Sequence, residues 1–344
     1  MNRTLAVSLA ALLASGGMAQ AQGVVNLYNW GNYTPPDLLE AFTEETGIQV
    51  NVTDFDSNDT ALARVRQGGH GFDIVVPSNT YVQTWVEDGL VQRLDDDIVT
   101  DRDNIAEEWR DVDFDPGREY SVPWAWGTTG VIVNTSVFEG DDIHDLGLIM
   151  DPPEELRGRI NVIPEMSDVM SMAIYYVGGD SSCTDDMEIL REARDVLMAA
   201  KPHWLALDYG TVDSYAAGDL DAGIYWNGAS MRVRLQNEDF AYGYPRTGYP
   251  IWMDNAMVLS DAQNTENAMR FINFILQPEN AAKISNFARY ANGISGSEEY
   301  MDEEMRDAPE IVVPEELVEF GRFGEACPQE ITDIHSQIWT ELLQ

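Results

Sequence analysis

Lysine is almost absent from this 344-residue sequence, and acidic residues far outnumber basic ones. The only lysines are Lys201 and Lys283, and aspartate and glutamate number 60 against 20 lysines and arginines. The formal net charge of −40 repels nucleic acids and anionic lipids, which argues against proteins that bind either. An acidic surface attracts cationic ligands, but it also keeps a protein soluble in salty surroundings, where salt screens its self-repulsion. Charge alone does not decide between these two roles.

Cysteine and histidine are also scarce. The two cysteines are Cys183 and Cys327, and the four histidines lie far apart, at positions 70, 144, 203 and 335. Neither cysteine has a second cysteine or a histidine at the spacing of a metal site, so we expect no metal and no cofactor. In an exported chain the two cysteines could form a disulfide, but their spacing leaves that pairing open.

Familiar catalytic motifs are missing as well. The sequence has no G-x-S-x-G elbow, no H-E-x-x-H, no P-loop and no Cys-His pair in a readable context. We therefore predict a protein that is not an enzyme. An exported hydrolase that uses paired carboxylates stays as an alternative, because the chain has many acidic residues.

Long apolar runs are confined to the first residues. Arg3 precedes an apolar run over residues 5–13, and Ala19-Gln20-Ala21 follows it. This pattern predicts a secretory signal peptide over residues 1–21 and a periplasmic protein. The run is much shorter than the roughly 20 residues that a membrane span needs, and no later segment qualifies. The mature chain then has about 320 residues, enough for two lobes of ordinary size.

Strand and helix patterns alternate in the first part of the chain. Residues 24–30 form an apolar strand, and Pro35-Pro36 open a helix that ends at Gly47. Residues 48–55 form a strand, a helix over residues 58–67 begins with Asn58 as its cap, and residues 72–77 form a buried strand. This alternation predicts a mostly parallel sheet with helices on its faces.

A second α/β unit follows. It is predicted from one or two strands over residues 119–134, a strand at 160–164, helices around 167–177 and 184–200, strands at 221–228 and 250–260, and helices at 264–277, 280–290 and 328–343. No linker separates the units, so we expect two lobes joined by crossing strands. The predicted bounds are 22–127 for lobe 1, 128–254 for lobe 2, 255–320 for a return to lobe 1, and 321–344 for a C-terminal helix on lobe 2 or the hinge. The best hinge candidates are residues 126–131 and the stretch just after Asp254.

Aromatic and acidic residues stand where predicted strands end. Trp30, Ser78 and Trp226 each close a strand, and Trp252 and Asp254 are two apart, so they face the same side of an extended strand. Parallel α/β sheets bind ligands beyond the carboxyl ends of their strands. A carboxylate accepts hydrogen bonds from an ammonium group, and an aromatic face attracts a cation. The pattern predicts a pocket for an organic cation, whereas Trp85, Trp109, Trp204 and Trp339 are expected to be packing residues.

Seven segments together resemble the periplasmic spermidine/putrescine-binding proteins, the solute receptors of polyamine ABC transporters. They are LYNWGNYTPPDLLEAFTEETGIQV (27–50), SND (57–59), GFDIVVPSNTYV (71–82), YSVPWAWGTTGVIVN (120–134), YWNGAS (225–230), IWMDNAMV (251–258) and FINFILQPENAAKIS (271–285). The resemblance implies two α/β lobes that close on one ligand, a polyamine as that ligand and an ABC permease as partner. We expect a monomer.

The resemblance also implies a set of ligand-binding residues: Trp30, Tyr33, Ser78, Glu165, Asp168, Trp226, Trp252, Asp254 and Tyr290. Trp226 and Trp252 resemble the rings that sandwich the carbon chain, and Asp254 resembles the carboxylate that grips one terminal amine. Glu165 and Asp168 are expected at the other end of the ligand, although "PEMSD" could instead cap the following helix.

The sequence departs from the family pattern at contact positions, and this leaves the ligand open. Gly31 stands where relatives commonly have a hydroxyl, Asn32 where some have an acid, and Thr80 where some have an aromatic ring. The same fold also serves receptors for amino acids, opines, agmatine or ferric iron. An amino acid would need a cationic partner for its carboxylate, for which Arg232 or Arg289 is available.

Two further features bear on the site. Adjacent tyrosines 175 and 176 could hold iron, but on a helix neighbours point about 100 degrees apart, so packing is expected. Glu325 is a loose candidate for the cleft.

Overall fold

The computed structural model describes residues 23–344. The predicted signal peptide, residues 1–21, lies outside them. Strands and helices alternate along the chain, and short 3-10 turns connect several of them. The strands are β1 Gly23–Trp30, β2 Ile48–Phe55, β3 Ile74–Val75, β4 Ser121–Asn134, β5 Ile160–Val162, β6 Trp204–Leu207, β7 Ala222–Trp226, β8 Phe240–Gly243, β9 Tyr249–Val258 and β10 Gly321–Phe323. The helices are α1 Pro36–Thr46, α2 Asn58–Arg66, α3 Asn79–Glu87, α4 Glu107–Arg110, α5 Gly147–Met150, α6 Met166–Tyr176, α7 Met187–Ala200, α8 Val212–Ala216, α9 Asn227–Arg234, α10 Thr265–Ile275, α11 Pro278–Ala288, α12 Glu303–Arg306 and α13 Gln329–Leu342.

The first β-α-β unit shows how local sequence sets the elements. Pro36 occupies the first turn of α1, where its missing N–H costs nothing. Leu38 and Phe42, one turn apart, are buried on the face of α1 that meets the sheet. Gly47 ends the helix in the left-handed conformation (φ 73°), and its N–H bonds to the carbonyl of Thr43. The chain then returns as β2, which pairs in parallel with β1.

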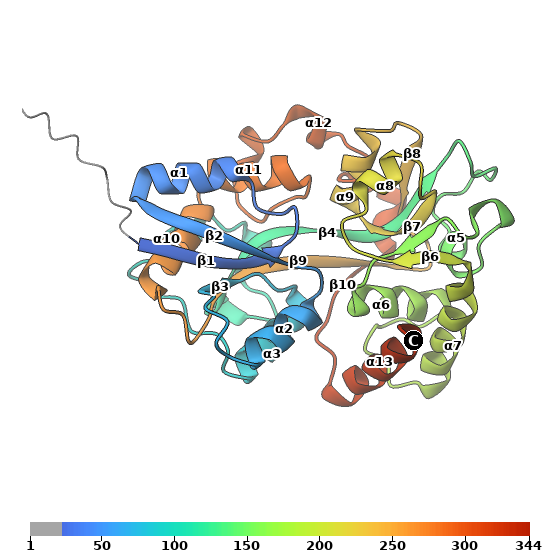
Figure 1. The fold of residues 1–344 in the computed structure, drawn as a ribbon, viewed down its shortest axis with the longest axis horizontal. Helices are drawn as coiled ribbons and strands as arrows, with labels where there is room; N and C mark the ends of the chain where they lie inside the picture. The colour runs from blue at the N-terminus through green and yellow to red at the C-terminus, as the bar shows by residue number, and fades with distance from the viewer. Residues whose placement is uncertain (1–22) are drawn as a thin grey trace, which may run out of the picture.

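Two lobes share one continuous sheet, with strand order β2-β1-β3-β9-β4-β7-β5-β6. Figure 1 shows β4 and β9 running side by side from one lobe into the other, with helices packed around both ends of the sheet. The two crossing strands are antiparallel, pairing Ser121 through Thr128 with Met257 through Ile251. The fold is thus the two-lobed α/β architecture predicted from the sequence.

Each lobe has its own hydrophobic core. The first lobe is built on β1–β3, α1–α3, α10 and α11, and its core contains Leu27, Phe42, Trp85 and Phe271. The second lobe is built on β5–β8 and α5–α9, and its core contains Ile160, Ile224 and Trp339. Trp109 and Trp204 also pack against these cores, so the four tryptophans assigned to packing do pack. The residue bounds given above for the lobes stay a prediction.

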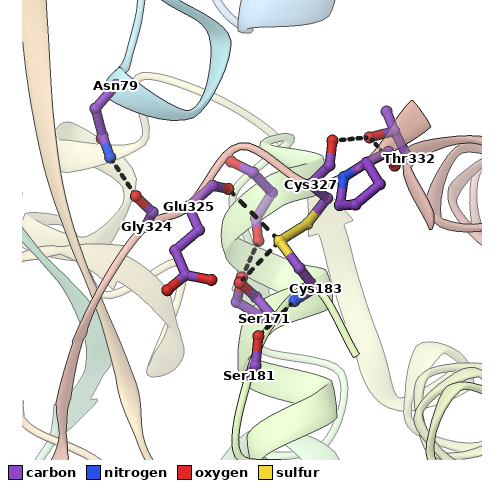
Figure 2. Close-up of a disulfide and its surroundings, with 11 residues drawn as sticks. Asn79, Ser171, Ser181, Cys183, Gly324, Glu325, Cys327 and Thr332 are labelled. Atoms are coloured by element: carbon purple, nitrogen blue, oxygen red, sulfur yellow. Dashed lines mark hydrogen bonds between the residues drawn. A yellow bond between two sulfur atoms is a disulfide. The ribbon is translucent and has the colours of Figure 1, made fainter. Parts of the chain in front are cut away.

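The C-terminal segment crosses between the lobes a third time. β10 pairs in parallel with β9, and the carbonyl of the adjacent Gly324 accepts a hydrogen bond from Asn79 of the first lobe (2.6 Å). Cys327 then forms a disulfide with Cys183, which lies between α6 and α7 of the second lobe (Cα–Cα 5.0 Å; Figure 2). The helix α13 that follows packs on α6 and α7. The pairing that the sequence left open is therefore present.

The structure corrects two expectations. Ser57, not Asn58, caps α2, because Ser57 has extended backbone and its hydroxyl accepts from the N–H of Thr60. Asn58 is the first helical residue, and its side chain turns to Ser78 instead. The sheet is mixed rather than mostly parallel, because β9 and β4 each run antiparallel to their neighbours β3 and β7.

In residues 23–344 we find no helix with both the length and the apolar character of a membrane span. The same residues hold no cluster of three metal-ligating side chains.

Candidate functional site

A cavity lies between the lobes; its empty space, counted together with the solvent at its mouth, is about 590 Å³. All nine site residues predicted from the sequence line it. The complete lining is Trp30, Gly31, Asn32, Tyr33, Ser78, Glu165, Asp168, Tyr209, Gly210, Val212, Tyr225, Trp226, Ala229, Arg232, Trp252, Asp254 and Tyr290. Their roles in binding stay a prediction, but the structure does bring them together.

Asp254 is held on the wall that β9 contributes. Its Oδ1 accepts from the Ser78 hydroxyl (2.7 Å) and its Oδ2 from the Tyr33 hydroxyl (2.8 Å). Ser78 reaches it because the segment before α3 bridges β9 at this residue. Trp252 lies two residues earlier on the same strand and lines the same cavity, as the two-residue period of a strand predicts. The carboxylate is thus fixed in place by two hydroxyl donors.

Two more carboxylates come from the segment that opens α6 in the second lobe. Asp168 Oδ2 accepts from the Thr129 hydroxyl (2.6 Å) and from the Trp226 indole N–H (3.1 Å). Glu165 accepts from Ser167 through Oε1 (3.0 Å) and, across the lobes, from the N–H of Asn58 through Oε2 (3.2 Å). Glu165 stands at the N-cap of α6 but makes no side-chain capping bond there. Capping alone therefore does not explain this acidic pair.

Aromatic rings cover the walls between these carboxylates. Trp30 lies 6.2 Å from Trp226, centroid to centroid, and meets it edge to face. On the other side, Tyr290 lies 5.1 Å from Trp252 and 5.5 Å from Tyr33. The Trp30 ring is fixed by a hydrogen bond from its Nε1 to the carbonyl of Val76 (3.0 Å). Rings from both lobes thus face one cavity.

The three carboxyl groups of the cavity have raised pKa values. Burial raises the pKa of Asp254 to about 7, although the hydrogen bonds from Ser78 and Tyr33 act to lower this pKa. Burial also raises the pKa of Glu165 to about 8, with help from the nearby charge of Asp168. The pKa of Asp168 itself is raised by burial to about 6. Three buried carboxyls that resist ionisation mark a place where a cation would relieve the desolvation of each charge.

Three polar residues at or beside the cavity are absent from the site predicted from the sequence, where Arg232 is named only as a possible partner for an amino acid's carboxylate. Tyr209 follows β6, a strand that was not predicted, and its hydroxyl donates to the carbonyl of Gly31 in the other lobe (2.8 Å). Arg232 on α9 lines the cavity, and its Nη1 donates to the carbonyl of Asn32 (3.2 Å). Asn58 joins two acids indirectly, since its Nδ2 donates to Ser78 (3.1 Å) while its N–H bonds Glu165. The strand-end rule would have found Tyr209 had the short strand WLAL been recognised.

Other candidates lie elsewhere. Tyr175 and Tyr176 pack against the second core. Arg289 is engaged by Asp302 (2.7 Å) and Glu304 (3.1 Å). Glu325 and Thr80 do not contribute to the lining of the cavity.

Comparison with known proteins places this geometry in a family. Residues 37–312 match the model of the bacterial extracellular solute-binding proteins. The chain is 31% identical over 288 residues to the spermidine/putrescine-binding periplasmic protein of Escherichia coli K12, covering 83% of this chain and 82% of the relative. It is 28% identical over 357 residues to a putrescine-binding periplasmic protein of Pseudomonas aeruginosa, covering 98% and 96% of the two chains.

A solved structure agrees with these relatives. The structure titled as a putative spermidine/putrescine ABC transporter from Listeria monocytogenes superposes with a TM-score of 0.87 at 28% identity, over 93% of this chain and 99% of that one. The chain belongs to the family of bacterial extracellular solute-binding proteins that includes the spermidine/putrescine-binding periplasmic proteins.

Proposed function

We propose that this protein captures a linear polyamine of the putrescine or spermidine class in the cavity between its lobes. The observation that carries the proposal is the arrangement of three buried carboxylates among aromatic rings from both lobes. A polyamine alternates ammonium groups with methylenes. Each ammonium offers charge-assisted hydrogen bonds to a carboxylate, and each methylene buried against a ring contributes roughly 0.8 kcal/mol.

The two ends of the ligand meet different lobes. Asp254, on the crossing strand β9, is bonded to first-lobe residues Ser78 and Tyr33 and grips one terminal ammonium. Asp168 and Glu165 stand on the second lobe and take the other end. Trp226 and Trp252 cover the carbon chain between them, and an indole face adds about 0.5–2 kcal/mol of cation–π attraction.

The work of the protein is capture and delivery, with no chemical change of the ligand. The lobes close on the ligand by bending of β4 and β9 where these strands pass from one lobe to the other, around residues 126–131 and just after Asp254. The closed form docks on an ABC permease, and the signal peptide over residues 1–21 directs the chain to the periplasm. Relatives named as periplasmic binding proteins support this role.

The first test is calorimetric titration of the mature protein with putrescine, spermidine and 4-aminobutyrate. The last compound matches putrescine in length but replaces one ammonium by a carboxylate. We expect saturable one-site binding of a polyamine that survives high salt, because a buried site is screened far less than the acidic surface. Asp254→Asn should abolish that binding, whereas the same substitution at the exposed Asp113 should leave it intact.

Tighter binding of 4-aminobutyrate than of either polyamine would refute the polyamine assignment. So would polyamine binding that disappears at high salt or that is equally strong in Asp254→Asn. Chromatography of the recovered ligand would detect any chemical change of the bound amine. Turnover detected in this way would contradict the non-enzymatic role.

A further inference from the structure

Arg232 brings the one guanidinium among the residues that line the cavity. It projects from α9 of the second lobe, and its Nη1 reaches the carbonyl of Asn32 in the first lobe (3.2 Å). Its Nε is closed off from solvent and has no hydrogen-bond partner. No lysine, histidine or second arginine lines the cavity.

A bound cation favours the ionised form of the three carboxyls, and the hydrogen bonds around them fit that form. Both oxygens of Asp254 and of Glu165 accept from protein donors, and Asp168 accepts two bonds on Oδ2. Three carboxylates and one guanidinium leave the cavity with two negative charges in excess. Buried charge is costly unless it is matched, so the best occupant carries two positive charges.

The wall of the cavity formed by Gly31 and Asn32 has little to offer a further ammonium. The carbonyl of Gly31 already accepts from the Tyr209 hydroxyl, and the carbonyl of Asn32 already accepts from Arg232. Gly31 itself provides no side-chain hydroxyl, and a Cβ there would lie 3.1 Å from the ring of Tyr209. This wall is therefore covered by a ring and a cation, and each of its two backbone carbonyls already accepts one hydrogen bond.

We propose that Arg232 makes the cavity selective for a linear diamine over a triamine. A third ammonium would place a further positive charge in a cavity that already contains Arg232, with no fourth carboxylate among the lining residues to receive it. The inference rests on the proposed polyamine function and narrows it to dications of the putrescine type.

The test compares putrescine, spermidine and 1,8-diaminooctane in calorimetric titrations. 1,8-Diaminooctane has the chain length of spermidine but two charges instead of three, so it separates length from charge. We expect putrescine to bind at least about tenfold more tightly than spermidine. We also expect 1,8-diaminooctane to bind more tightly than spermidine.

The variant Arg232→Gln removes the cation and should shift the spermidine-to-putrescine affinity ratio toward spermidine by about tenfold or more. Arg191→Gln, an exposed arginine on α7, makes the same change in net charge far from the cavity and should leave the ratio unchanged. If Arg232→Gln fails to fold, the wild-type comparison of the three amines decides the question alone.

Two results overturn the inference while leaving the proposed function intact. One is wild-type protein that binds spermidine as tightly as putrescine. The other is an Arg232→Gln variant that weakens both amines by the same factor, since Arg232 would then only tie the lobes together. Absence of one-site binding for every amine would instead refute the proposed function itself, and the selectivity with it.

Discussion

The substitution Asp254→Asn should make the ligand-free protein more stable at neutral and alkaline pH while it destroys the binding site. Burial raises the pKa of Asp254 to about 7 in the folded protein, against about 3.9 for an unfolded chain. The folded state therefore holds a proton that the unfolded state releases between pH 4 and 7. Stability falls as pH rises through this window, because the unfolded chain has released its proton while the folded state still holds one. The fall ends above about pH 7, where the folded state releases its proton too.

The size of the effect follows from the shift. A difference of about three pKa units corresponds to about 4 kcal/mol at pH 8, since each unit is worth about 1.4 kcal/mol. Relaxation and water entry reduce this value, so we expect a gain of about 2–4 kcal/mol. An asparagine keeps an acceptor for Ser78 or Tyr33 and offers its amide to the other hydroxyl, so no hydroxyl is left without a partner.

The assay is urea unfolding at a series of pH values from 4.5 to 8.5. To remove bound amine, the protein is first unfolded with its disulfide intact, dialysed and refolded. The stability difference between variant and wild type should grow with pH up to about pH 8. Asp115→Asn is the matched control, because this buried aspartate accepts from the N–H and hydroxyl of Ser121 and lies near the buried guanidinium of Arg118. That control should be destabilised. A difference for Asp254→Asn that is absent at pH 8, or that does not change with pH, would refute the reasoning.

Three further outcomes are expected. When the pH is lowered from 8 to 6, the Kd for putrescine should rise about tenfold from Asp254 alone, because protonation of a carboxyl with a pKa of about 7 competes with binding of the ammonium. Titration in buffers of different ionisation enthalpy should show proton release on binding. A Kd that does not change with pH would contradict this prediction. Trp226→Ala should weaken binding by about 1–2 kcal/mol, roughly tenfold, through loss of the indole face, with melting temperature as the control for folding; unchanged affinity would remove this ring from the site. Replacing Cys183 and Cys327 together by serine should lower the free energy of unfolding by about 3–5 kcal/mol, because the disulfide closes a loop of 144 residues. Reduction of the disulfide in the wild-type protein should have the same effect in urea unfolding, and equal stability of the reduced and oxidised protein would contradict this prediction.

Residues at strand ends are predictable because a strand has a fixed two-residue period and ends at a recognisable turn. This rule locates Trp30, Ser78, Trp226, Trp252 and Asp254 from the amino-acid sequence alone. The two α/β units are predictable for the same reason, since alternating helix and strand patterns are local.

Residues that reach the site from the opposite lobe are not predictable in this way. Arg232 lies on a helix, where nothing local shows which face meets the other lobe. Tyr209 was missed because a four-residue strand carries too little pattern. Ser57 and Asn58 are both good caps, so sequence preference cannot choose between them, and the choice depends on Ser78 and Glu165, which are distant in sequence.

The paired strands that cross between the lobes restrict how the molecule can move. β9 is hydrogen-bonded to β4 on one side and to β10 on the other, and the disulfide anchors the segment between β10 and α13 to the second lobe. Such a ribbon bends out of its plane while its ladder stays intact, but sliding one strand along another would break several hydrogen bonds at once. The proposed closure would then be a rotation about a single hinge axis, which lies in the plane of the ribbon and runs perpendicular to its strands. Every opening would retrace the same path, and the rings and carboxylates of the two lobes would return to register at each capture.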